Sequence, residues 1–133
     1  MPRTRFLAPF ALAAVALFAA CDTRVVTEPE FQPQVINLRN DFAFQIDGLA
    51  EFTNDVVYTW ASDGTAASVT QMPTVLTGTA TLFILDGAGT QVYQRSLAEN
   101  GSFTTTAGVP GNWTLHVKFQ EASGSASFRV TTQ

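Results

Sequence analysis

The chain has few of the residues that build disulfides, metal sites and nucleic-acid interfaces. Its single cysteine, Cys21, excludes an intrachain disulfide. One histidine and one cysteine supply too few ligands for an ordinary zinc site. Only 14% of residues are charged, the formal net charge is −4, and no basic stripe is present. A sparse and acidic surface of this kind repels phosphate, so we expect no nucleic-acid partner.

Long hydrophobic runs are also lacking, with one exception near the start of the chain. After Arg3 and Arg5, residues 6–20 contain no charge and no hydrogen-bonding side chain. As a helix this run would be about 22 Å long. Because the hydrocarbon core of a bilayer is roughly 30 Å thick, the run is too short to span it. The pattern predicts a signal peptide over residues 1–20.

The hydrophobic run ends in a short motif, Leu17-Phe18-Ala19-Ala20-Cys21. This motif resembles the lipobox of bacterial lipoproteins, with Phe18 at the position where leucine is commonest. The resemblance implies cleavage between Ala20 and Cys21 and attachment of a lipid to the Cys21 thiol. Two or more acyl chains would hold the protein stably at a membrane. The alternative is an ordinary secretory signal that is cut after Ala16.

Residues 21–34 are predicted to be a lipidated N-terminus followed by a tether. Pro29 and Pro33 lie in this largely polar segment, and proline-bearing polar segments stay extended. The competing interpretation is that Val25 and Val26 begin an edge strand. Residues 35–133 then form the folded domain.

Alternation of apolar and polar residues dominates this domain, and the helical period is absent. The clearest case is the run from Trp113 to Phe119, where bulky apolar residues alternate with polar ones. Strands are predicted near 35–39, 41–47, 55–62, 65–71, 79–86, 90–97, 102–106 and 112–120, with a ninth near 124–132.

Turn-forming pairs separate the predicted strands and suggest chain reversals. They include Asp47-Gly48, Asp63-Gly64, Asp86-Gly87, Asn100-Gly101 and Ser123-Gly124-Ser125. The spacing predicts an all-β fold: an antiparallel β-sandwich of about eight or nine strands, jelly-roll or immunoglobulin-like.

Two stretches carry a family resemblance. Residues 79–92, with Asp86 and Gly89 between two strand-like runs, resemble the hairpin of bacterial pre-peptidase C-terminal domains. Residues 108–117 are similar to the closing strand of those domains, with Trp113 at the position of their tyrosine. The resemblance implies an accessory or binding sandwich and no catalysis.

Candidate catalytic residues are few. His116 is expected to be a solvated strand histidine, since no nucleophile motif accompanies it. The carboxylates of Asp47, Asp63, Asp86 and Glu121 fall at predicted strand ends or turns, where aspartate commonly serves the turn. Loop carboxylates are also potential calcium ligands, although no calcium-binding motif is present. No catalytic residue, metal ligand or cofactor is therefore predicted.

Aromatic side chains are the remaining candidates for a binding surface. Trp60 and Trp113 share faces with other bulky residues, which predicts that both lie in the core, whereas Tyr93 is expected to point outward. Residues 80–85 are apolar on both faces and need a cover. The segment from Ala98 to Val109 is the favoured cover, and a partner chain is the alternative.

The sequence therefore favours a non-enzymatic, lipid-anchored domain outside the cytoplasm, in the periplasm or at the cell surface. It would bind or scaffold a protein or polysaccharide at the bacterial cell envelope. The alternatives are a surface polysaccharide-binding module and, less favoured, a carboxylate-based hydrolase.

Overall fold

The computed structural model describes residues 32–72 and 75–133, which form antiparallel strands and turns. Within these residues no helix is long and apolar enough to cross a membrane. The described strands are β1 (Gln34–Leu38), β2 (Asp41–Ser62), β3 (Ala67–Gln71), β4 (Leu76–Leu85), β5 (Gln91–Ser96), β6 (Gly101–Thr104) and β7 (Gly111–Thr132). The all-β, antiparallel fold predicted from the sequence is confirmed.

Alternation along the strands determines which side chains enter the core. In β7, Trp113, Leu115 and Val117 are fully buried. The intervening Thr114 and His116 are only partly buried, and Lys118 is exposed. The same two-residue period buries Ala80, Leu82 and Ile84 in β4. The core is therefore built from one face of each strand, as a pleated strand requires.

Strands β2 and β7 form the centre of the fold. They pair antiparallel along their whole length, from Asp41 opposite Thr131 to Ser62 opposite Gly111. The strand order along the sheet is β1-β2-β7-β3-β6, while β4 also pairs with β7 and β5 pairs with β4. One half of the β2–β7 ribbon thus pairs with β1 and β3, and the other half pairs with β4.

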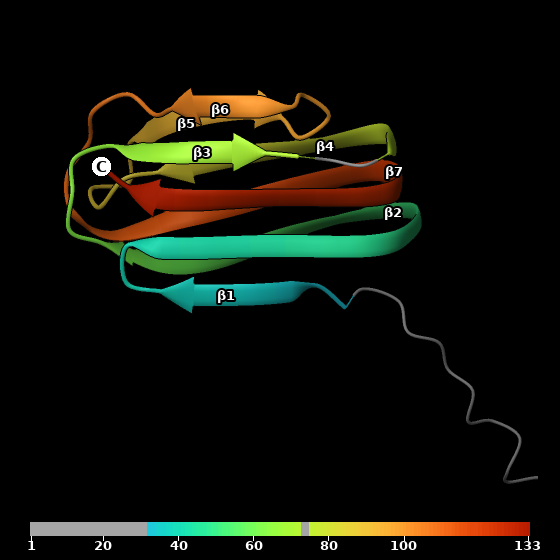
Figure 1. The fold of residues 1–133 in the computed structure, drawn as a ribbon, viewed down its shortest axis with the longest axis horizontal. Coiled ribbons are helices and arrows are strands. Elements are labelled where there is room, and N and C mark those ends of the chain that lie inside the picture. Colours follow the sequence, from blue (N-terminus) through green and yellow to red (C-terminus); the bar gives the residue numbers. More distant parts are fainter. Residues whose placement is uncertain (1–31, 73–74) are drawn as a thin grey trace, which may run out of the picture. The chain divides into compact units, whose positions relative to one another are not determined.

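The β2–β7 ribbon folds over on itself, so that its two halves face each other (Figure 1). The ends of β2 meet: the Asn40 N–H donates to the Ala61 carbonyl at 2.9 Å. Rings from the two halves of β2 also touch, with Phe42 and Tyr58 centroids 5.3 Å apart. The buried faces of the two halves form one core.

The bend lies at the register shifts between Ile46 and Asn54. Two bulged glutamates, Glu51 and Glu121, both have φ of 47°. The Glu51 N–H donates to Ser123 Oγ at 2.9 Å, and the Glu121 N–H donates to Thr53 Oγ1 at 2.8 Å. Each strand therefore supplies the hydroxyl that holds the bulge of the other, and bulges bend a strand without ending it.

Because of this bend, two of the expected turns and the expected number of strands are wrong. The segments around Asp47-Gly48 and Ser123-Gly124-Ser125 do not reverse the chain between separate strands; both lie inside continuous strands, β2 and β7. The four strands expected at 41–47, 55–62, 112–120 and 124–132 are therefore two long ones, and the described residues form seven strands. A residue that tolerates positive φ serves a bulge as well as a turn, so the sequence pattern is the same.

Candidate functional site

The predicted lipidation site lies outside the described residues. Ala20 and Cys21, the cleavage and lipid-attachment positions, belong to the part of the chain that the structure does not describe. So do Val25 and Val26. Cleavage, lipidation and an early edge strand stay predictions.

His116 lies on the outer face of β7, where its side chain is one-third exposed. Its Nε2 atom is 3.7 Å from Asp55 Oδ1 and has no hydrogen-bond partner. The imidazole ring packs beside Phe83, with ring centroids 5.5 Å apart. A histidine that activates a nucleophilic side chain needs a hydroxyl or thiol within hydrogen-bond reach, and the Nε2 atom of His116 has none.

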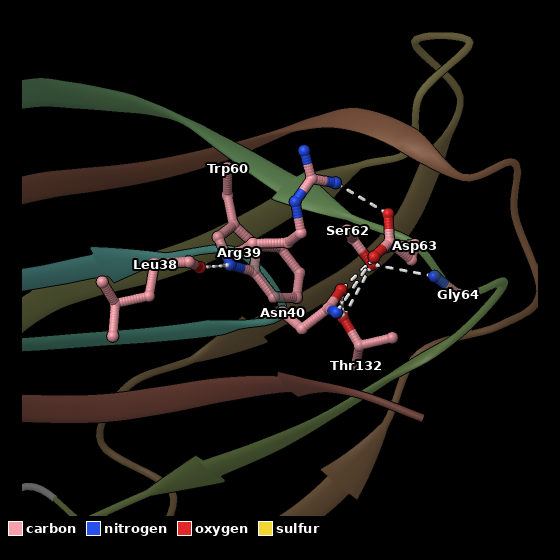
Figure 2. A network of polar contacts seen from close by, with 8 residues as sticks. All are labelled: Leu38, Arg39, Asn40, Trp60, Ser62, Asp63, Gly64 and Thr132. Carbon is pink, nitrogen blue, oxygen red and sulfur yellow. Dashed lines mark hydrogen bonds and ion pairs between the residues drawn. The ribbon is translucent and has the colours of Figure 1, made fainter.

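Asp63 belongs to a polar network that closes one end of the domain (Figure 2). Its carboxylate accepts hydrogen bonds from Arg39 at 2.8 Å and Asn40 at 3.2 Å. Asn40 Oδ1 in turn accepts from the Asp63 N–H at 2.8 Å and from the Thr132 hydroxyl at 3.0 Å. The network joins the β1–β2 turn, the end of β2 and the end of β7. The Asp63 carboxylate thus links the end of β2 to the β1–β2 turn, and Asn40 links that turn to the end of β7.

Asp86 is buried at the same end and is held by backbone groups. Its Oδ1 accepts from the Ala88 and Thr90 N–H groups at 2.9 and 2.8 Å. Its Oδ2 accepts from the Val109 N–H at 2.9 Å. Hydrogen bonds to the ionised carboxylate, that from Thr90 above all, hold the pKa of Asp86 below its usual value. A catalytic acid needs a raised pKa, so the environment of Asp86 suits a structural anion.

Asp47 and Glu121 lie at the other end of the domain, near the bend. The register of β2 and β7 places this bend far from the end closed by Asp63 and Asp86. The four candidate carboxylates are therefore divided between two ends, and within the described residues no hydrogen bond joins one to another. Among residues 32–72 and 75–133, no group of three or more His, Cys, Asp or Glu side chains is placed to hold a metal ion.

The tryptophans are core residues, as predicted. Trp60 and Trp113 are fully buried and pack edge to face, with centroids 5.9 Å apart. Their indole N–H groups donate to the carbonyls of Leu38 at 3.0 Å and Val109 at 2.8 Å. Buried indoles need such partners. Neither ring can serve as a stacking platform on the surface.

Tyr93 was expected to point outward, and this is wrong. A bulge opposite Ile84 and Leu85 turns both Val92 and Tyr93 into the core, and Tyr93 is 7% exposed. Its hydroxyl donates to Oε1 of the buried Gln71 at 2.8 Å, and burial raises the pKa of Tyr93 to about 12. Strict alternation cannot reveal an extra residue in one strand.

The apolar stretch of β4 divides between the two faces. Leu82 and Ile84 face the core, whereas Phe83 and Leu85 lie half-buried on the outer face, opposite His116 and Thr114 of β7. The segment expected to cover them, Ala98 to Val109, makes its hydrogen bonds to other parts of the domain. Thr105 and Gly108 donate to Ala67 and Thr65, and Thr106 and Val109 donate to Val92 and Asp86.

Two hollows mark the described surface. One, of about 240 Å³, is mainly apolar and is lined by Gln34, Ile36, Ala43, Phe44, Gln45, Met72, Ser127, Phe128 and Arg129. The other, of about 390 Å³, lies at the bend and is lined by Thr53, Gly78, Thr79, Gln120 and Glu121. The charged side chain in the first lining is Arg129, and the charged side chain in the second lining is Glu121. Neither lining contains a histidine, the side chain that most often serves as a general acid or base.

Comparison with known proteins gives no family model that matches the chain and no curated protein that matches it significantly. The resemblances to a lipobox and to pre-peptidase C-terminal domains therefore stay predictions.

Proposed function

We propose that this chain is a lipid-anchored β domain that binds or scaffolds a partner at the bacterial cell envelope, outside the cytoplasm, and has no catalytic role. The observation that carries the proposal is the position of Cys21. The chain's one cysteine directly follows a hydrophobic run of fifteen residues and two small residues, Ala19 and Ala20. Lipidation is the chemistry that uses a thiol at that place.

A binding role is supported by how the reactive groups are engaged. The Asp63 carboxylate holds Arg39 and Asn40, and Asp86 holds three backbone N–H groups. The His116 Nε2 contacts no hydroxyl. The two aspartates serve the fold, and the sheet faces and edges of the domain remain as surfaces for a partner.

Radioactive palmitate labelling in a bacterial host tests the anchor. We expect the full chain to be labelled and to remain in the membrane fraction, and the Cys21→Ala variant to lose both properties. Phe18→Leu, which restores the commonest lipobox, is the matched control and should be labelled at least as strongly as the wild type. Equal labelling of the wild type and Cys21→Ala would refute the lipid anchor.

The polysaccharide-binding alternative loses its leading candidates, because Trp60, Trp113 and Tyr93 are buried. Phe83, beside His116, and Phe103, under Arg95, are among the rings that are only partly buried. No further observation favours this alternative, so the protein-binding or scaffolding role is the one we propose.

A further inference from the structure

The free edges of the sheet differ in how they are protected. An edge strand presents unpaired N–H and C=O groups, and proteins usually cover or block them. The second half of β2 is such an edge, and two asparagines block it. Asn37 Nδ2 donates to the Thr59 carbonyl at 2.9 Å, and the Asp55 N–H donates to Asn54 Oδ1 at 2.8 Å.

The edge at β5 is blocked in the same way. The Val92 carbonyl accepts the Thr106 N–H at 3.0 Å, and the Ser96 carbonyl accepts from Gln71 Nε2 at 2.8 Å. Groups of the domain itself therefore occupy positions that an added strand would need. These two edges are poor sites for strand addition.

Strand β1 is less protected within the described residues: one of its backbone groups, the Leu38 carbonyl at the end of the strand, accepts from Trp60 Nε1 at 3.0 Å. It ends the strand order and pairs with β2 alone. It contains no charged residue, and Ile36 and Leu38 are 56% and 58% exposed. At the other end of the order, β6 has four residues and no exposed large apolar side chain. Of the four edges, β1 best fits the description of an edge that accepts another strand.

We propose that β1 pairs antiparallel with β1 of a second copy of this chain, about a two-fold axis at Ile36. This inference goes beyond the proposed function and does not depend on the anchor. A strand paired with its own copy gives a closed, isologous interface. Gln34 then lies opposite Leu38 of the second copy, and Ile36 lies opposite its own equivalent.

Charge is compatible with a second copy as the occupant, because β1 is itself a neutral strand of the kind that a neutral edge accepts. Within the described residues, Asp and Glu outnumber Lys and Arg by eight to four, so most pairings between two copies bring like charges together. The β1 edge avoids this because all five of its side chains are neutral. The charged residues near β1 are paired within the domain, Arg39 with Asp63 and Arg129 with Asp41, each with an N–O distance of 2.8 Å. Because β1 is short, the dimer is expected to be weak.

Cross-linking through introduced cysteines tests the pairing in the full chain. Directly opposite residues of an antiparallel pair have Cα atoms about 4.5–5.5 Å apart, which is within reach of a disulfide. We expect Ile36→Cys to give a disulfide-linked dimer under mild oxidation. Val57→Cys is the matched control, since Val57 is 58% exposed on the blocked edge of β2. Equal cross-linking of both variants, or none in Ile36→Cys, would overturn the proposal.

In this experiment the wild-type chain is the control that distinguishes failure of the lipid anchor from failure of the β1 pairing. A lipidated Cys21 cannot form a disulfide, so a wild-type dimer would count against the anchor. The difference between Ile36→Cys and Val57→Cys would still test β1.

Sedimentation of lysine variants tests the same pairing without a cross-link. Ile36→Lys would place two like charges opposite each other at the axis, and we expect it to weaken dimerisation about tenfold or more. Val57→Lys should leave dimerisation unchanged. Equal dimerisation of both variants and the wild type would contradict pairing through β1.

Discussion

At the residue scale, a carboxylate in this domain is best understood through the donors around it. Asp86 accepts hydrogen bonds from the N–H groups of Ala88, Thr90 and Val109, and so ties the β4–β5 turn to the segment before β7. These donors favour the ionised form. The side chain that the sequence offers as a candidate acid is therefore part of the framework.

This arrangement predicts a pH dependence of stability. The pKa of Asp86 is lower in the folded protein than its usual value, so its contribution to the free energy of unfolding is present above that usual value, near pH 4. The contribution is lost as the pH falls through the folded-state pKa. We expect Asp86→Asn to destabilise the domain at pH 7 and to reduce its loss of stability in acid.

Urea unfolding at pH 7 and pH 3 measures this effect. Asp47→Asn is the control, because Asp47 is exposed and its carboxylate contacts only Gln45, at 3.3 Å. Its stability should fall in acid as the wild type does. An Asp86→Asn variant with the wild-type difference between the two pH values would show that the carboxylate is not held as described.

At the element scale, the bend of β2 and β7 depends on close backbone packing. Gly78 of β4 has φ of 77°, and a Cβ there would collide with the Glu121 carbonyl oxygen. Gly48 has a similar φ of 71° but nothing within 4 Å of its Cβ position. The two glycines therefore separate backbone strain from steric contact.

We expect Gly48→Ala to cost about 1–2 kcal/mol, the strain of a left-handed conformation for a residue with a side chain. Gly78→Ala should cost distinctly more, because the β4–β7 pairing must shift as well. Chemical denaturation of the two variants measures the difference. Equal losses of stability would mean that β4 does not pack against the bulge at Glu121.

The strands were predictable from the sequence, and the bend was not. Alternation identifies the core residues of β7, because burial of one face leaves a two-residue period in the chain, whereas residues 80–85 of β4 are apolar on both faces and leave the choice of face open. The bulges at Glu51 and Glu121 leave no such mark, since their residues look like a turn. The bulge that buries Tyr93 also leaves no recognisable pattern in the sequence. These features arise from pairing between distant segments, which a local pattern does not contain.

For the candidate site, the sequence predicts that Asp63 and Asp86 lie at strand ends or turns, and they do. It does not reveal their partners Arg39 and Val109, because these come from distant segments of the chain. The absence of a catalytic group stays a prediction. The less protected edge at β1 could not be recognised beforehand. Its significance depends on knowing that Asn37, Asn54 and Gln71 block the other edges.

At the scale of the whole molecule, one long ribbon of two strands, β2 and β7, contains more than half of the residues that lie in strands. Folding the ribbon over lets Phe44 of the first half of β2 contact Tyr58 of the second half, with centroids 6.1 Å apart. The remaining strands extend the two halves. The proposed contact with a second copy uses β1, which extends the first half of β2.

The fold-over of β2 is the central claim, and a distance between spin labels at Gln45 and Thr59 tests it most directly. Both residues are exposed, so the labels should not disturb the core. In a Cys21→Ala background, a straight strand would separate the two backbone positions by about 46 Å. The folded ribbon places its layers about 10 Å apart, so we expect a label distance of about 20–30 Å. A distance distribution centred above about 40 Å would contradict the fold-over.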